Sequence, residues 1–165
     1  MRKVFLIAMA ATLVITVGAQ NKAKNNSPKQ AATTQQTSEK GKPESNIELL
    51  TAATFKQKVM NYDNGQYDWK YIGTKPCIID FYADWCRPCR MLSPELEKIA
   101  EKYKDKIVVY KIDTEKEKEL ARLFNISSIP ALLFVPSADK KPSMLRGYRD
   151  ATQLEEEVKT ILLAK

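Results

Sequence analysis

The chain has 165 residues, of which 44% are hydrophobic, and this is typical of one globular domain with a tail. Most of the formal charge of +7 falls on the first 45 residues, where seven basic side chains oppose two acidic ones. Residues 46–165 carry the remaining net charge of +2. Lys and Glu alternate there as on a solvated surface, which argues against nucleic-acid binding. The absence of histidine excludes Ser-His and Cys-His hydrolases of the usual design and most catalytic zinc sites.

The N-terminus has the pattern of an export signal. Arg2 and Lys3 precede an apolar run over residues 4–17, and small residues then offer a cleavage site before Gln20. The run has 14 residues, whereas a membrane span needs about 20. We therefore expect a cleaved signal over residues 1–19, with a retained anchor as the alternative. This predicts a periplasmic protein, or an extracellular one if the organism has a single membrane.

Residues 20–45 are polar and lack large apolar side chains, so they cannot bury enough surface to offset the entropy of ordering. We predict a disordered linker there and a folded domain over residues 46–165. The domain is expected to begin with an edge strand at residues 47–50. Thr51 or Thr54 then caps a helix that runs to about Tyr62, and Asn64-Gly65 marks a turn.

The stretch over residues 66–72 is rich in aromatic side chains. Two interpretations stay open for the aromatics at 67–71: a docking patch for a partner protein, or loop side chains packed on the core.

The rest of the chain alternates between strands and helices. β-branched and aromatic runs predict strands at 76–82, 107–112, 131–135 and 144–146, the last closed by Gly147. Apolar residues at helical spacing predict helices over 86–103 and 116–124, and a last helix in which Thr152 and Glu155 form a capping box. This order predicts an α/β fold with an antiparallel hairpin late in the chain.

Cys86 and Cys89 lie where the predicted central strand meets a helix. Three residues apart in a first helical turn, their sulfurs fall on one side, within bonding reach. Backbone N–H groups and the helix dipole stabilise a thiolate there, and Pro88 fits the first turn because it needs no N–H. The pattern predicts dithiol–disulfide chemistry. The third cysteine, Cys77, is expected to be a small buried hydrophobe, with a regulatory thiol as the alternative.

A set of residues around the two cysteines matches a known pattern. In chain order it comprises Asp80, Phe81, Ala83, Trp85, Cys86, Arg87, Pro88, Cys89, Pro94, Ile129, Pro130 and Gly147. With this order and spacing, residues 47–163 resemble an exported thioredoxin. The resemblance implies the thioredoxin fold, a central mixed β-sheet flanked by helices on both faces.

The resemblance also implies roles for these residues. Cys86 becomes the attacking, more exposed thiolate and Cys89 the sheltered resolving thiol. Asp80 matches the family's buried acid, where desolvation raises the pKa towards neutrality and allows proton exchange with Cys89. Pro130 matches the family's cis proline, which leaves the Ile129 backbone free to pair with a substrate strand. The rest of the substrate-binding surface is assigned to Trp85, Arg87, Pro88 and Gly147.

The sequence departs from the family pattern at three points, one of which is a longer connection around residues 67–73. Arg87 stands where the family usually has glycine, and a cation beside Cys86 favours the thiolate and a more oxidising pair. The family's lysine near the buried acid aligns with Val109, and Lys111, two residues on and on the same side of the strand, is the candidate substitute.

We therefore expect a monomeric protein-disulfide reductase that acts on disulfide-bonded exported proteins without a metal or organic cofactor. A membrane or soluble thiol donor would re-reduce it. Export and Arg87 favour a disulfide oxidase or isomerase as the alternative. A non-catalytic binding module is a third possibility, whereas a copper or zinc carrier lacks the histidine that completes such a site.

Overall fold

The computed structural model describes residues 46–63, 69–136 and 140–164. The predicted export signal, the linker and the turn at Asn64-Gly65 lie outside the described residues. Among those that are described, no helix combines the length and the apolar character needed to cross a membrane.

The described strands form one mixed five-stranded sheet in the order β1-β3-β2-β4-β5. Their bounds are β1 Ile47–Leu49, β2 Cys77–Tyr82, β3 Val108–Asp113, β4 Ala131–Val135 and β5 Ser143–Arg146. β3 pairs in parallel with β1 and β2, whereas β4 runs antiparallel to β2 and β5. The predicted edge strand, central strand and late hairpin are therefore confirmed.

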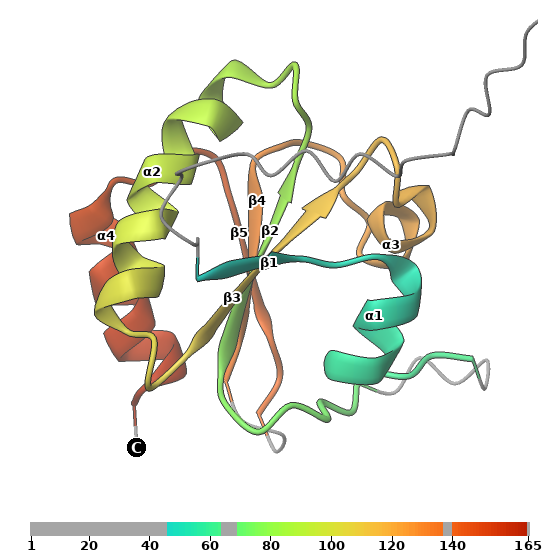
Figure 1. The fold of residues 1–165 in the computed structure, drawn as a ribbon, viewed down its shortest axis with the longest axis horizontal. Coiled ribbons are helices and arrows are strands. Elements are labelled where there is room, and N and C mark those ends of the chain that lie inside the picture. The colour runs from blue at the N-terminus through green and yellow to red at the C-terminus, as the bar shows by residue number, and fades with distance from the viewer. Residues whose placement is uncertain (1–45, 64–68, 137–139, 165) are drawn as a thin grey trace, which may run out of the picture. The chain divides into compact units, whose positions relative to one another are not determined.

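Helices cover both faces of the sheet (Figure 1). The bounds are α1 Ala52–Lys58, α2 Arg87–Lys102, α3 Lys118–Leu123 and α4 Ala151–Glu157, and α4 continues into the π-helical segment η1, Val158–Leu162. In Figure 1, α2 and α4 lie on one face, and α1 and α3 lie on the other. The predicted thioredoxin fold, a mixed sheet between two helical layers, is confirmed.

The alternation of side chains along β2 divides the core into two apolar layers. Ile79 and Phe81 pack in the layer that contains Phe55 of α1 and Leu120 of α3. Ile78 points the other way and packs in the layer that contains Leu92, Leu96, Leu154 and Val158. Asp80 shares the α2 side of the strand with Ile78, and this places it under the N-terminal turns of α2.

Three helix boundaries differ from the prediction, and one of them is the start of α3, at Lys118 rather than residue 116. α1 ends at Lys58 rather than near Tyr62, because the Val59 carbonyl accepts a hydrogen bond from Ile72 N–H at 2.9 Å. Val59 and Tyr62 are nevertheless buried. The chain reaches Tyr62 by a turn rather than by a longer helix.

The last helix begins at Ala151, and its cap is Asp150 rather than Thr152. The Asp150 carboxylate accepts from Gln153 N–H at 2.9 Å, and the Gln153 side chain accepts from Asp150 N–H at 3.2 Å. In addition, Ala151 N–H donates to the Glu95 carboxylate of α2 at 3.2 Å. A tertiary partner therefore favours the earlier start.

Tyr67 lies outside the described residues, and the two described aromatic side chains of this stretch, Trp69 and Tyr71, pack on the core. Tyr71 is buried and its hydroxyl donates to the Lys75 carbonyl. Trp69 meets Phe124 edge to face, with 6.2 Å between ring centroids. The second of the two interpretations, loop aromatics packed on the core, therefore holds for Trp69 and Tyr71.

Candidate active site

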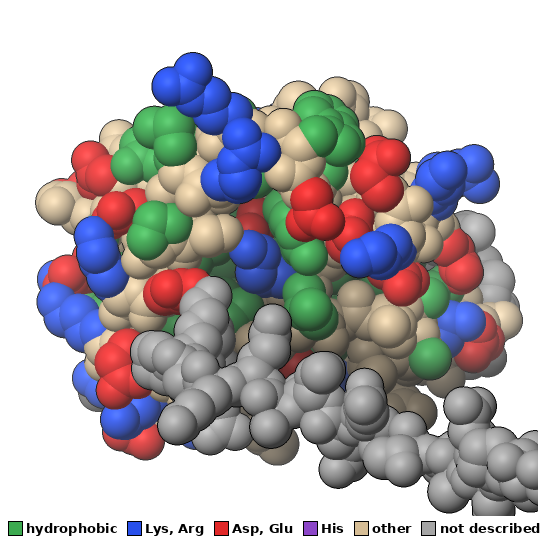
Figure 2. Space-filling view, turned by 45° about the horizontal axis from the view of Figure 1, so that its top comes forward, with side chains coloured by type: hydrophobic (Ala, Val, Ile, Leu, Met, Phe, Trp, Pro, Cys, Tyr) green, Lys and Arg blue, Asp and Glu red, His purple; other side chains and the backbone are tan. Residues whose placement is uncertain are grey.

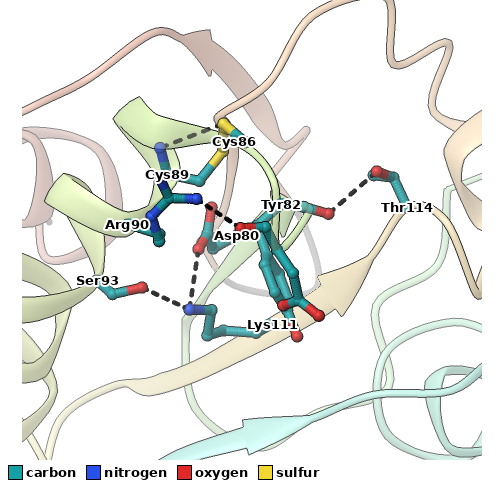
Figure 3. Close-up of a disulfide and its surroundings, with 9 residues drawn as sticks. Asp80, Tyr82, Cys86, Cys89, Arg90, Ser93, Lys111 and Thr114 are labelled. Carbon is teal, nitrogen blue, oxygen red and sulfur yellow. Dashed lines mark hydrogen bonds and ion pairs between the residues drawn. A yellow bond between two sulfur atoms is a disulfide. The ribbon is translucent and has the colours of Figure 1, made fainter.

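Cys86 and Cys89 form a disulfide at the N-terminus of α2, with Cα atoms 5.3 Å apart (Figure 3). Cys86 is the N-cap of the helix, and its Sγ accepts a hydrogen bond from Cys89 N–H at 3.2 Å. Pro88 lies in the first turn, where it removes no helical hydrogen bond. When the disulfide is reduced, the same N–H and the helix dipole favour a thiolate at Cys86.

The two cysteines differ in what they face rather than in exposed area. Cys86 is 3% exposed and Cys89 2% in the disulfide form, so the expected greater exposure of Cys86 is barely visible as area. Cys86, however, lines a surface pocket of about 470 Å³, and Cys89 does not. The pocket is lined by Trp85, Cys86, Arg87, Pro88, Thr114, Ile126, Ser127, Ser128 and Ile129. An incoming disulfide in this pocket therefore meets Cys86 first.

Trp85 projects outward beside the pocket and is 67% exposed. Figure 2 shows that hydrophobic side chains on the face turned to the viewer form small separate patches among acidic and basic ones. A protein partner that meets this face contacts both apolar and charged groups.

The segment before β4 forms the other wall of the pocket. The Ile129–Pro130 peptide bond is cis, and Ile129 packs against Ala83 and the two cysteines. Between described residues, no hydrogen bond occupies the Ile129 backbone. Gly147 lies behind this wall: its N–H donates to the Pro130 carbonyl at 2.9 Å, and its φ of +90° favours glycine.

Asp80 is completely buried beneath the disulfide (Figure 3). Neither carboxyl oxygen has a hydrogen-bond partner among the described residues, and the Lys111 ammonium lies 3.8 Å from Oδ2. Burial raises the Asp80 pKa to about 7, and the charge of Lys111 opposes that rise. Asp80 can therefore gain or lose a proton near neutral pH.

Lys111, rather than Val109, is the lysine beside the buried acid. It lies directly opposite Asp80 in the β2–β3 register, whereas Val109 is buried in the apolar layer under α2 and α4. The Lys111 ammonium donates to Ser93 Oγ at 2.7 Å and lies 4.4 Å from the centre of the Tyr82 ring. Spacing pointed to this lysine only as a possible substitute, because strand register cannot be read from the sequence.

Sequence reasoning missed four residues that shape the site. Ser93 follows Cys89 by one helical turn, and Tyr82 follows Asp80 by one strand repeat, so spacing alone offered a signal for both. Arg90 donates to the Asp84 carbonyl at 2.7 Å and joins α2 to the loop before it. The Thr114 N–H and hydroxyl both donate to the Tyr82 carbonyl, at 2.9 and 3.0 Å. These contacts fix the end of β2 under the disulfide.

Cys77 lies on the opposite face of β2 and packs in the layer between the sheet and α1 and α3. It is a free thiol with no exposed surface, and burial raises its pKa to about 12. These properties are those of the small buried hydrophobe that the sequence predicted. Across the described ranges, no three His, Cys, Asp or Glu side chains are grouped so that they could hold a metal ion.

Comparisons with known proteins agree with this geometry. A family model described as Thioredoxin matches residues 46–160. A thioredoxin from Borreliella burgdorferi is 42% identical over 110 residues, which cover 67% of this chain and 92% of that protein. A thioredoxin from Alicyclobacillus acidocaldarius is 35% identical over 113 residues, with 68% and 95% covered. The crystal structure of a chloroplastic thioredoxin z is similar with a TM-score of 0.57 and 27% identity, covering 70% of this chain and 93% of its own.

Proposed function

This chain belongs to the thioredoxin family of thiol–disulfide oxidoreductases, and we propose that it reduces disulfides in exported proteins through Cys86 and Cys89. The observation that carries the proposal is the redox pair itself: a disulfide at a helix N-terminus, with Cys86 in a surface pocket and Asp80 buried beneath. Thiol–disulfide exchange needs these groups and no further cofactor.

In the first step, the Cys86 thiolate of the reduced protein attacks one sulfur of a substrate disulfide. The substrate S–S bond breaks, a mixed disulfide forms with Cys86, and the other substrate sulfur leaves as a thiolate that takes a proton from water. The Cys89 N–H, which points at Cys86 Sγ, stabilises the attacking thiolate.

In the second step, the ionised Asp80 accepts the proton of Cys89. The Cys89 thiolate attacks Cys86, the mixed disulfide breaks, and the substrate leaves with its second sulfur reduced. Two electrons have then passed from the Cys86–Cys89 dithiol to the substrate. A membrane or soluble thiol donor returns the protein to the reduced state.

The substrate is held as an extended segment in the pocket beside Cys86. The proposal is supported by the Ile129 backbone, with which no described residue forms a hydrogen bond, and by the exposed Trp85 ring, which lines the same pocket. An extended segment pairs with such a backbone by main-chain hydrogen bonds that do not depend on its sequence. This arrangement suits a reductase that acts on several proteins.

The site of action is proposed from the signal pattern at residues 1–19. N-terminal sequencing of the protein from an expressing bacterium tests it. We expect the mature chain to begin at Gln20 in the envelope or extracellular fraction. An intact N-terminus in the cytosol would contradict export, and an intact N-terminus in the membrane would support the retained anchor.

Reduction of insulin tests the activity. The wild-type protein with an excess of dithiol should accelerate the reduction, and Cys86→Ala should return it to the background rate. Cys89→Ala should accumulate a mixed disulfide with insulin, visible by mass spectrometry, because the resolving thiol is absent. A wild-type rate in Cys86→Ala would contradict the proposal.

Arg87 favours a second candidate, a disulfide oxidase or isomerase, because a cation near Cys86 stabilises the reduced pair. Refolding of a reduced, denatured disulfide protein separates the two candidates. Faster disulfide formation than insulin reduction by the same preparation would favour the second.

A further inference from the structure

The Lys111 ammonium has three neighbours at the base of the active site (Figure 3). It donates to Ser93 Oγ at 2.7 Å, lies 3.8 Å from Asp80 Oδ2, and lies 4.4 Å from the centre of the Tyr82 ring. Only the contact with Ser93 is within hydrogen-bond distance. Ser93 therefore takes the hydrogen bond that the nearby carboxyl does not receive.

Burial makes this arrangement consequential. The Lys111 side chain is 17% exposed and Asp80 is not exposed at all, so water competes little with either group. A half-buried ammonium without an acceptor is costly, and a buried carboxylate without a donor is costly too. An ammonium has three N–H donors and can serve both acceptors, but at its observed position Lys111 reaches Ser93 and stays 3.8 Å from Asp80.

Ser93 also connects this cluster to the redox pair. It follows Cys89 by four residues, one turn of α2, so the two side chains lie on the same side of the helix. Its half-buried hydroxyl bridges from the helix to Lys111 on β3. The contact therefore joins the helix that carries the resolving cysteine to the strand that lies beside Asp80.

We propose that Ser93 is a positioning residue whose hydroxyl holds the Lys111 ammonium away from direct contact with Asp80, and so keeps Asp80 able to exchange a proton with Cys89. The second part of this inference rests on the proposed function, since proton exchange matters only if Cys89 resolves a mixed disulfide. The first part concerns the ion pair alone.

The surroundings of Asp80 contain few other charged or titratable groups. α2 contributes Cys89 and Arg90, whose guanidinium donates to the Asp84 carbonyl. The loop before α2 contributes Cys86, β2 the Tyr82 ring, and β3 Lys111, while the residue opposite on β4 is the apolar Leu132. The charged groups that act on the Tyr82 ring, apart from Asp80 and Lys111, are Asp84, Asp113 and Lys116. Among the described residues, Lys111 is the cation that opposes the rise of the Asp80 pKa.

The effect depends on distance. Burial raises the Asp80 pKa to about 7 even with Lys111 at 3.8 Å. The Coulomb energy of an ion pair grows as the charges approach, and a direct N–H···O contact adds a charge-assisted hydrogen bond. A closer ammonium would therefore stabilise the carboxylate and make it a weaker base for the Cys89 proton.

Ser93→Ala removes the acceptor and leaves the Asp80 carboxylate as the nearest polar partner of Lys111. We expect the ammonium to move into contact with it and the Asp80 pKa to fall by about one unit. NMR titration of the carboxyl carbon of Asp80 in the oxidised full-length protein measures this directly. An unchanged or higher Asp80 pKa in Ser93→Ala would overturn the proposal.

Two further variants separate positioning from a general structural effect. Ser93→Thr keeps a hydroxyl at the same place and should retain the wild-type Asp80 pKa. Thr160→Ala removes a hydroxyl that bonds the Glu156 carbonyl on the last helical segment, far from Asp80 in the chain, and should also leave it unchanged. A shift of the same size in Thr160→Ala, or in Ser93→Thr, would contradict the specific role of the Ser93 hydroxyl.

The pH profile of mixed-disulfide resolution is the second readout. In Ser93→Ala the acid limb should move to lower pH by the same amount as the Asp80 titration, and the plateau rate should fall a few-fold because the base is weaker. If the titration shifts but the wild-type protein does not reduce insulin, the proposed function fails and the positioning of Lys111 stands. If insulin is reduced and the Asp80 titration does not shift in Ser93→Ala, the proposed function stands and the positioning role of Ser93 fails.

Discussion

Cys77 and Asp80 are two buried titratable groups on one strand, and only Asp80 can exchange a proton near neutral pH. Both belong to β2, neither has exposed surface, and three residues place them on opposite faces of the sheet. Burial raises the pKa of each, to about 12 for the Cys77 thiol and to about 7 for the Asp80 carboxyl. Burial thus keeps the Cys77 thiol protonated and unreactive at neutral pH, and it brings the pKa of Asp80 to the pH at which proton exchange is useful.

Starting pKa and neighbours explain the difference. The ordinary pKa of a thiol is well above that of a carboxyl, so desolvation keeps Cys77 protonated at neutral pH. Cys77 lies in a layer of apolar side chains. The ordinary pKa of the Asp80 carboxyl is low, and the Lys111 ammonium on the paired strand limits how far burial raises it. The face of β2 under α2 thus holds a proton acceptor below the disulfide, and the other face holds a thiol that serves as packing.

Replacing the cysteines one at a time gives the largest expected contrast. Cys86→Ala should abolish insulin reduction because the attacking sulfur is lost, whereas Cys77→Ala should keep the wild-type rate. In the folded, oxidised protein Cys77 should also resist alkylation, since its thiol is protonated and buried. Loss of activity in a folded Cys77→Ala protein would break the contrast.

Asp80→Asn should slow resolution of the mixed disulfide on the order of 100-fold at pH 7, the scale of general-base catalysis. Asp80 acts as a base only when ionised, so the wild-type rate should rise through pH 7 and the variant should lose this bend. Single-turnover kinetics with a Cys86-linked peptide would show it. A variant that keeps both the rate and the bend would contradict the role of Asp80.

Asp80→Asn should also raise the stability of the protein, although it slows the reaction. The Asp80 pKa is raised on folding from 3.8 to about 7, so the folded state binds the extra proton and the free energy of unfolding falls as pH rises across that window. The asparagine variant lacks this loss and should be more stable by roughly 4 kcal/mol at pH 8, with little difference near pH 4. Urea unfolding at both pH values measures the effect, and a variant less stable at pH 8 would contradict the burial argument.

Arg87→Gly should give the smallest effect, a rise in the Cys86 pKa of about half a unit, because an exposed cation acts through solvent. Arg87→Lys keeps the charge and should keep the wild-type pKa. The ultraviolet absorbance of the thiolate follows the titration. Equal pKa values in all three proteins would show that Arg87 does not tune the nucleophile.

Much of this architecture was predictable from local patterns. The apolar runs that became β2 and β4 and the periodic stripe of α2 lie where the sequence placed them, because burial on both faces and helical spacing leave strong signals. The redox pair was predictable for the same reason, since Cys86 and Cys89 are close in the chain.

What the sequence could not supply were contacts between distant segments. α1 ends early because Val59 bonds Ile72, and α4 starts early because Ala151 N–H meets Glu95. The lysine beside Asp80 was uncertain by two residues for the same reason, since only the β2–β3 register places Lys111 there. Local sequence patterns determine which segments form helices and strands, and tertiary hydrogen bonds determine where these two helices begin or end.

The equilibrium reduction potential of the Cys86–Cys89 pair tests the central claim most directly. The mature protein would be equilibrated with glutathione buffers of known ratio, and the fraction of disulfide measured by mass spectrometry after alkylation. A reductase predicts a value near the established potential of thioredoxin, about −270 mV. A value near about −180 mV, typical of protein disulfide isomerase, would contradict the account and make this chain an oxidant or isomerase.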